Sequence, residues 1–343
     1  MPVHEEVEDE EEDGIEPTHT HIGALTNFGI QTSEIKKLKE AGISTAEGVL
    51  RITKRKLEQI KGISTAKAEK LREAAANVAK KPSFQTAKDA IVDRAAHVVY
   101  VSTGCAELDA IFGGGIESGS ITEFYGEYRT GKTQLCLTVC VSCFLPRALG
   151  GGEGRALFLD TEGTFRPERL EPVASRYQLD ADFVLENVMH ARVHNCDHLE
   201  ELLRDAAGLF ADADDQGGPF RVLIIDSIIA LYRQEFIGRG ELAERQQRIG
   251  KVLAEVKNLA EIFNLAVIIT NQVTADPGAS AAFVQDAKKA VGGHIVAHIS
   301  DTRVFLRKGK GEQRIARIEQ HPMQPPAEAC FQVGLGGVTE PTE

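Results

Sequence analysis

The chain has 343 residues, 42% of them hydrophobic, which is enough for one large domain with a substantial core and a smaller second domain. It contains no apolar run of about 18 residues or more and its start is acidic, so we expect a soluble, intracellular protein without a membrane partner. The formal charge of −12 would disfavour a nucleic-acid partner, but eight acids lie within residues 5–13, which leaves −4 for the rest.

The N-terminal part divides into an acidic segment and a helical module. Residues 1–19 predict a disordered, solvated tail. Residues 20–80 have a helical pattern in which GISTA occurs at 42–46 and again at 62–66. Each copy puts a glycine between two helices and offers Ser or Thr to cap the second one. The second copy predicts a helix-hairpin-helix, which serves either to contact DNA phosphates or for helix packing and protein docking.

Residues 81–99 are predicted to be a linker. Its one apolar side chain at the start, Phe84, stands in polar surroundings with Ala87 three residues later. Phe84 is either a lone surface residue or an anchor that docks into a pocket of a neighbouring molecule.

From residue 100 to 343 apolar runs alternate with helical segments, which predicts an α/β fold with a largely parallel central sheet. Ligands of such sheets bind at the carboxyl ends of the strands. After the first run, Cys136, Cys140 and Cys143 fall on one face of a predicted helix. A free cysteine behaves as a small hydrophobic residue, so we expect these three to be buried. No fourth ligand accompanies them, which disfavours a metal site.

The segment GEYRTGKT, residues 126–133, satisfies the phosphate-loop pattern G-x-x-x-x-G-K-[ST]. It follows an apolar run and opens a helix, which is the context that the pattern requires. Lys132 is expected to reach the β- and γ-phosphates of ATP, and Thr133 to bind Mg²⁺. The other expected nucleotide contacts of this loop are Gly126, Glu127, Tyr128, Arg129, Thr130, Gly131 and Gln134.

Three further strands are expected to deliver polar side chains to the same edge of the sheet. VLIID ends in Asp226, a candidate Mg²⁺ ligand. LFLDTE ends in two acids, of which Glu162 is the better candidate to activate water because it lies past the strand end. LAVIIT leads to Asn271 and Gln272, whose amides could bind a γ-phosphate and pass the nucleotide state to the loop behind them.

That loop, residues 273–292, is too long for an ordinary connection in a compact domain. Pro277 breaks regular structure, Lys288 and Lys289 supply positive charge, and Phe283 either meets DNA or packs beneath the loop. A second basic segment, residues 301–317, is read equally well as a phosphate-binding patch or a solvated face.

Taken together, these motifs resemble the RecA-like strand-exchange recombinases of eukaryotes and archaea. GEYRTGKTQLC, LDTEGTFRPERL, LIIDSIIALYR, TNQVTADPG and LRKGKGEQRIARI stand in the order and spacing of that family, and the resemblance covers about residues 20–340. GRGELAERQ, TADPG and GGHI are more similar to the meiosis-specific recombinase than to the general one.

The resemblance implies residue roles. Glu162 is implied as the catalytic glutamate, and Gln272 as the link from γ-phosphate to the second DNA-binding loop, residues 273–292. Arg239 is implied in the first DNA-binding loop. Phe84 and Ala87 are implied as a polymerisation motif, and His298 as a residue that approaches the neighbour's ATP. Arg169 and Pro325 are implied to flank adenine. Gln320-His321-Pro322 departs from the family's Asp-Ser-Pro, which leaves the ATP cap and its cation dependence open.

The implied function is a DNA-dependent ATPase of the nucleus that uses ATP and Mg²⁺. It forms a helical filament on single-stranded DNA, or a ring without DNA, and exchanges strands with double-stranded DNA in meiosis, together with recombination accessory proteins. The alternatives are a general recombinase, a non-catalytic recombination mediator and a ring helicase.

Overall fold

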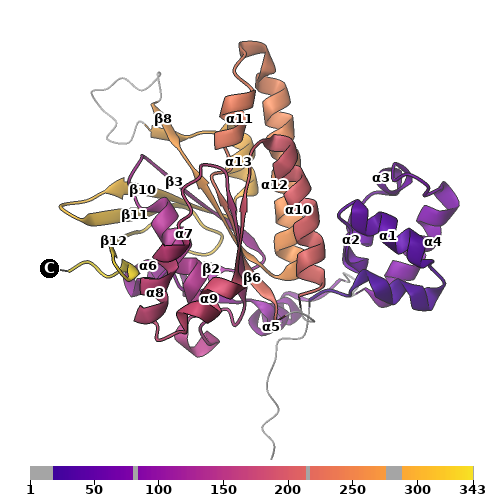
Figure 1. Ribbon diagram of the computed structural model, residues 1–343, viewed down its shortest axis with the longest axis horizontal. Helices are drawn as coiled ribbons and strands as arrows, with labels where there is room; N and C mark the ends of the chain where they lie inside the picture. The colour runs from indigo at the N-terminus through magenta and orange to yellow at the C-terminus, as the bar shows by residue number, and fades with distance from the viewer. Residues whose placement is uncertain (1–17, 80–83, 214–216, 276–287, 343) are drawn as a thin grey trace, which may run out of the picture.

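The computed structural model describes residues 18–79, 84–213, 217–275 and 288–342, which form a helical bundle and an α/β core (Figure 1). The bundle has its own apolar centre, which includes Leu25, Leu38 and Leu71. Its elements are η1 (Ile22–Phe28), α1 (Thr32–Glu40), α2 (Ala46–Arg51), α3 (Lys54–Glu58) and α4 (Thr65–Val78).

The GISTA repeat caps helices as predicted, but its two copies do so at different positions. Thr45 caps α2 by accepting the backbone N–H of Gly48 at 3.0 Å. Ser64 caps α4 by accepting the backbone N–H of Lys67 at 3.4 Å. The helix after the second copy therefore begins one residue earlier in the repeat.

Polar contacts join the bundle to helices α10 (Cys196–Ala211) and α12 (Leu242–Phe263) of the core. Asp212, at the end of α10, accepts from His21 at 3.0 Å and from Lys39 at 3.2 Å. Thr18 donates to the carbonyl of Ile262 at 2.7 Å. Most of these groups are half exposed, so each contact stabilises the arrangement only weakly.

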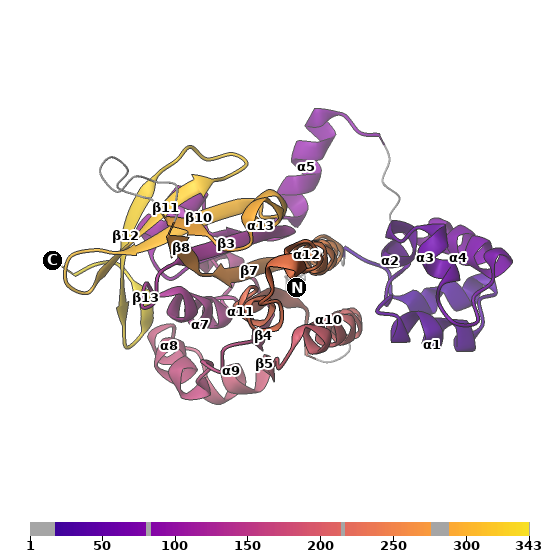
Figure 2. The same ribbon diagram turned by 90° about the horizontal axis from the view of Figure 1, so that it is seen from above.

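Within the predicted linker, residues 87–97 form helix α5 (Ala87–His97), which buries none of its residues. Thr86 and Asp89 form a capping box at its start, with the Asp89 N–H donating to Thr86 Oγ1 at 3.2 Å. Figure 2 shows α5 projecting from the core. Phe84 precedes it and is fully exposed, and Ala87 is its first residue.

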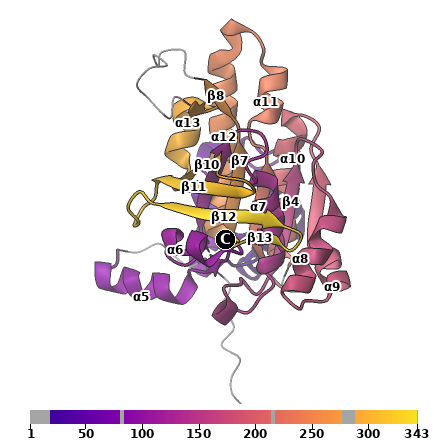
Figure 3. The same ribbon diagram turned by 90° about the vertical axis from the view of Figure 1, so that its left-hand side faces the viewer.

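The core contains a nine-stranded sheet in the order β13-β12-β11-β10-β3-β7-β6-β4-β5. The six strands from β10 to β5 are parallel, and β11, β12 and β13 extend the sheet antiparallel, as Figure 3 shows. The predicted α/β class with a largely parallel sheet is confirmed. The strands are β3 (Ser120–Gly126), β4 (Arg155–Asp160), β5 (Val188–Arg192), β6 (Phe220–Asp226), β7 (Ala266–Asn271), β10 (Thr302–Lys308), β11 (Gln313–Gln320), β12 (Glu328–Gly334) and β13 (Gly337–Thr339).

Helices cover both faces of the sheet and bury two apolar layers. One face carries α6 (Ala106–Phe112), α7 (Lys132–Ser142), α8 (Leu170–Arg176) and α9 (Ala181–Asn187). The other carries α10, α12, α11 (Ala230–Glu235) and α13 (Gly293–Ile299). Cys136 and Cys140 of α7, and Cys143 directly after it, are buried in the first layer, as predicted.

The short elements are β1 (Tyr100–Val101), β2 (Ile116–Glu117), η2 (Arg147–Leu149), η3 (Pro167–Arg169), η4 (Arg239–Glu241), β8 (Val273–Ala275) and β9 (Lys288–Ala290). Among the described residues, no helix is both long and apolar enough to cross a membrane.

Candidate functional site

The phosphate loop lies between the end of β3 and the start of α7, and it depends on two glycines. A Cβ on Gly126 would stand 2.3 Å from the carbonyl oxygen of Leu306 in the neighbouring strand, so a side chain cannot fit. Gly131 has a φ of 98°, which other residues rarely adopt. Together they let the backbone turn sharply and present the N–H groups at the start of α7.

This loop forms one wall of a cleft of about 940 Å³ at the carboxyl edge of the sheet. The predicted strand-end residues Glu162, Asp226 and Gln272 line the same cleft. The structure thus brings together residues at the carboxyl ends of five strands of the parallel sheet, because Lys308, the last residue of β10, also lines the cleft. The lining residues are Gly126, Glu127, Tyr128, Arg129, Thr130, Gly131, Lys132, Thr133, Gln134, Glu162, Thr164, Asp226, Gln272, Val273 and Lys308.

Lys132 is held at the mouth of this loop. Its Nζ donates to the carbonyls of Gly126 and Glu127 at 2.9 and 2.8 Å. Burial lowers the pKa of this ammonium group, and Asp226 and Glu162 oppose that shift. A phosphate in the cleft would supply the negative charge that a buried cation lacks.

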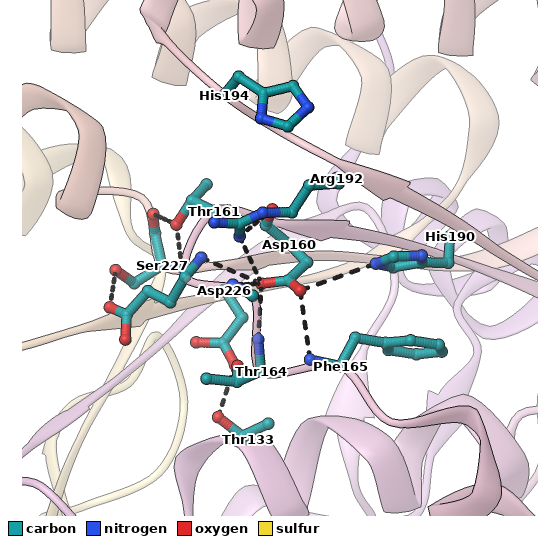
Figure 4. A network of polar contacts seen from close by, with 12 residues as sticks. Thr133, Asp160, Thr161, Thr164, Phe165, His190, Arg192, His194, Asp226 and Ser227 are labelled. Atoms are coloured by element: carbon teal, nitrogen blue, oxygen red, sulfur yellow. Dashed lines mark hydrogen bonds and ion pairs between the residues drawn. The ribbon is translucent and has the colours of Figure 1, made fainter.

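Asp226 and Thr133 form the polar pair on which a divalent cation would bind. The Thr133 hydroxyl donates to Asp226 Oδ2 at 2.6 Å (Figure 4). Thr270 donates to the other carboxylate oxygen. Burial raises the pKa of Asp226. A carboxylate and a hydroxyl beside a phosphate loop are the oxygen donors that Mg²⁺ prefers, so these residues fit the predicted ion.

Glu162 is positioned by two hydrogen bonds to the same oxygen, Oε1. Ser227 donates to it at 2.8 Å and Gln272 Nε2 at 3.0 Å. Within the described chain no residue donates to Oε2, which leaves that oxygen to accept a proton from water in the cleft. The geometry suits a carboxylate that orients an attacking water.

Gln272 has a second partner. Its Oε1 accepts from Arg233 on α11 at 2.9 Å, so one amide joins Arg233 to Glu162. Ser227 and Arg233 were not singled out from the sequence. The available signal was the segment LIIDSIIALYR, in which Ser227 directly follows the strand-end Asp226 and Arg233 is the last residue.

Asp160, the other acid of its strand end, has a structural role (Figure 4). It accepts the backbone N–H groups of residues 162–165 at 2.7–3.3 Å and pairs with Arg192 at 3.2 Å. Although burial alone would raise its pKa, these donors lower it. Asp160 shapes the turn that carries Glu162, which agrees with the sequence-based preference for Glu162.

The residues expected near adenine are separated within one chain. Arg169 Nε donates to Gln134 Oε1 at 2.8 Å, and its guanidinium also donates to the carbonyls of Gly334 and Leu335. Pro325 is exposed in the loop after the Gln320 end of β11, which is the opposite end of the sheet from the phosphate loop. Arg169 and Pro325 of one chain therefore do not flank a common site.

Other predicted residues lie outside the cleft. His298 is exposed on α13, and Arg239 begins η4. Lys288 and Lys289 belong to β9, which pairs antiparallel with β8. Two DNA-binding predictions, Pro277 and Phe283, fall outside the described residues.

The basic segment 301–317 divides between the two interpretations. Arg303, Arg307 and Arg317 pair with acids, namely Glu123, Glu328 and Glu319. Lys308 lines the cleft, and Arg314 donates to the carbonyl of Arg129 in the phosphate loop at 3.2 Å. The segment is therefore mainly structural, with its Lys308 end at the candidate phosphate site.

Comparison with known proteins gives a consistent result. The Rad51 family profile matches residues 94–341. The chain is 46% identical to "Meiotic recombination protein DLH1" of Candida albicans over 95% of this chain and 99% of that one. It is 48% identical to the human "Meiotic recombination protein DMC1/LIM15 homolog" over 94% and 93% of the two chains. It is 47% identical to "Meiotic recombination protein DMC1 homolog B" of Oryza sativa subsp. japonica over 98% and 94%.

Proposed function

The chain belongs to the Rad51 family, and on that premise we propose that it is an ATP-dependent recombinase that pairs homologous DNA and exchanges strands in meiosis. The observation that carries the proposal is the hydrogen bond from Gln272 to Glu162 at 3.0 Å. This bond connects Glu162, which is placed to activate water, to Gln272, the first residue after β7, where the long loop begins. A nucleotide switch for DNA binding needs such a contact.

In the proposed mechanism, ATP binds with its phosphates on the loop at 126–133. Lys132 would hold the β- and γ-phosphates, and Thr133 with Asp226 would hold Mg²⁺. When bound, Mg²⁺ neutralises charge on the phosphates. Glu162 orients the attacking water, and Ser227 keeps its carboxylate in place.

DNA binding is assigned to two segments, one that follows α11 and one that follows β7. Arg239 lies in the first, after α11, and the second is the loop 273–292, with Pro277, Phe283, Lys288 and Lys289. Gln272 directly precedes the second segment, and it contacts Glu162 in the cleft and Arg233 on α11, the helix before the first segment. It therefore connects the cleft to both segments. Its amide would change partners when a γ-phosphate arrives, and both segments would respond.

Self-association is proposed through Phe84 and Ala87. Phe84 is fully exposed, and a side chain of that size is stabilised by an apolar pocket on a second copy. The separation of Arg169 and Pro325 also favours a nucleotide held between subunits, with His298 facing the neighbour's ATP. A filament built this way would acquire complete sites only on assembly.

We predict that Phe84→Glu abolishes assembly, because a carboxylate cannot enter an apolar pocket without a large desolvation penalty. Light scattering with ATP and single-stranded DNA would then detect a smaller species. Leu149→Glu, on η2 and 67% exposed, is the matched control and should assemble normally. Normal assembly of the Phe84 variant would contradict docking by this residue.

The proposed function is tested by strand exchange. The purified chain with ATP, Mg²⁺, circular single-stranded DNA and a homologous linear duplex should form joint molecules. The absence of joint molecules together with undetectable DNA-stimulated ATP hydrolysis would instead favour a mediator, and unwinding of a forked duplex would favour a helicase. A general recombinase differs in where it acts, so staining of meiotic nuclei and capture of accessory proteins there would test the meiotic assignment.

A further inference from the structure

A glutamate lies buried in the middle of the sheet, outside the nucleotide cleft. Glu123 is in β3, between β10 and β7, and its side chain is 0% exposed. Moving a carboxylate into such surroundings costs several kcal/mol unless its oxygens are bonded and its charge is paired. Both conditions are met. Arg303 Nε donates to Oε2 at 2.6 Å, and Asn271 Nδ2 donates to Oε1 at 2.7 Å.

Asn271 carries this contact to the ends of the long loop. Its Nδ2 also donates to the carbonyl of Val291 at 2.6 Å, and its Oδ1 accepts the backbone N–H of Gln272 at 2.8 Å. The Val291 N–H in turn donates to the Gln272 carbonyl at 2.9 Å. One buried amide therefore joins the residue before β8 to the residue after β9.

These bonds fix the backbone of Gln272 on both sides, at its N–H and at its carbonyl. Only its side chain remains free to exchange partners, and that side chain now bonds Glu162 and Arg233. An amide that must move between a carboxylate and a phosphate needs a backbone that does not move with it. If the backbone moved as well, the change of side-chain partner would not be passed on to the loop.

We propose that Glu123 is a positioning residue that couples the nucleotide cleft to the DNA-binding loop by holding Asn271, and through it Gln272 and the base of the β8–β9 pair. The inference rests on the proposed function, because it concerns how ATP hydrolysis answers DNA. Glu123 is not among the residues that line the nucleotide cleft. Its contribution is the fixed geometry at the point where β7 leaves the sheet.

The competing explanation is that Glu123 merely pairs with Arg303 to hold β10 against β3. The same strands offer a control for that role. Asp301, just before β10, pairs with Lys257 at 2.6 Å and accepts the Ile121 N–H at 2.8 Å, at the end of the sheet away from the cleft. A purely structural ion pair should behave as Asp301 does.

The test measures the ratio of ATPase rates with and without single-stranded DNA, each variant being compared with its own rate without DNA. Glu123→Gln keeps the volume, but its amide offers one oxygen to the two donors from Arg303 and Asn271. Asn271→Asp sets two carboxylates against each other. We expect the ratio to fall about fivefold or more in Glu123→Gln and further in Asn271→Asp. Asp301→Asn should keep the wild-type ratio.

The double variant Glu123→Gln with Asn271→Asp gives the sharpest outcome. The introduced amide can donate to the introduced carboxylate, so the ratio should recover above that of Asn271→Asp alone. A double variant no better than Asn271→Asp, or wild-type ratios in both single variants, would overturn the inference.

If Glu123→Gln does not fold, Glu123→Asp keeps the charge and shortens the side chain, and a wild-type ratio in it would overturn the inference equally. A wild-type protein whose ATPase does not respond to DNA would instead overturn the proposed function.

Discussion

The two ends of the parallel strands both bury polar groups, yet they do different things with them. At the amino end, Asp301 and Lys257 pair, and Ser118 bonds Asn264 at 2.7 Å. These contacts end in backbone groups, such as the Ile121 N–H and the carbonyl of His97. At the carboxyl end, the contacts of Asp226, Glu162 and Gln272 border a cleft of about 940 Å³.

This contrast shows where a function can reside in this fold. A satisfied polar network stabilises the sheet whichever end it occupies. Only a network that borders a cavity can exchange a protein partner for a ligand, and the groups at the carboxyl end border one. Substitutions at the two ends should therefore separate activity from stability.

The largest effect should come from Lys132→Ala at the carboxyl end. The loss of this cation should weaken ATP binding about a hundredfold or more, because a preorganised donor to the phosphates disappears from a buried site. Titration with a fluorescent ATP analogue measures the affinity, and the yield of joint molecules should fall with it. Normal joint-molecule yields would show that the carboxyl end does not drive the activity.

Glu162→Gln should leave ATP binding intact and slow hydrolysis about a hundredfold, the contribution of a positioned general base. Ser227→Ala removes one of the two hydrogen bonds that hold Glu162, and should slow hydrolysis about tenfold. Single-turnover hydrolysis measures both. An equal loss in the two variants, or a loss of binding in Glu162→Gln, would contradict the role assigned to Glu162.

The fold can be predicted from the sequence because the signals that indicate it are local. Apolar runs of strand length and the glycines of the phosphate loop report on their own residues and neighbours. It also brought Asp226, Glu162 and Gln272 to one edge, because parallel strands end on the same side. Each of these assignments needed only the chain direction.

What the sequence could not supply was register. Glu123 meets Arg303 because the two are paired across β3 and β10, and it reaches Asn271 two residues along β7. Arg233 meets Gln272 although 39 residues separate them along the chain. Residues 87–97 were assigned to a linker although they form a helix, since α5 buries no side chain that would mark a helical face.

A smaller effect should appear in the pH dependence of Mg²⁺-supported ATP binding. Burial raises the pKa of Asp226 above its ordinary value of 3.8, and only the ionised form binds a cation. Protons should therefore begin to displace Mg²⁺ at a higher pH than for an exposed aspartate, and affinity should fall severalfold on acidification. Asp226→Asn is the control, since its remaining pH dependence comes from the nucleotide. If ATP affinity depended on pH equally in the wild type and in Asp226→Asn, this explanation would be contradicted.

The smallest effect on activity should come from Asp301→Asn at the amino end. The amide still accepts the Ile121 N–H but loses the charge that pairs with Lys257, so unfolding should become easier by about 1 kcal/mol, the upper range for a partly exposed pair. ATP affinity and hydrolysis should equal those of the wild type, because the pair lies at the end of the strands away from the cleft. Thermal unfolding measures the loss of stability, and an ATPase assay measures hydrolysis. If hydrolysis fell while stability held, the two ends of the sheet would be coupled, and function in this fold would extend through the strands rather than reside at one edge.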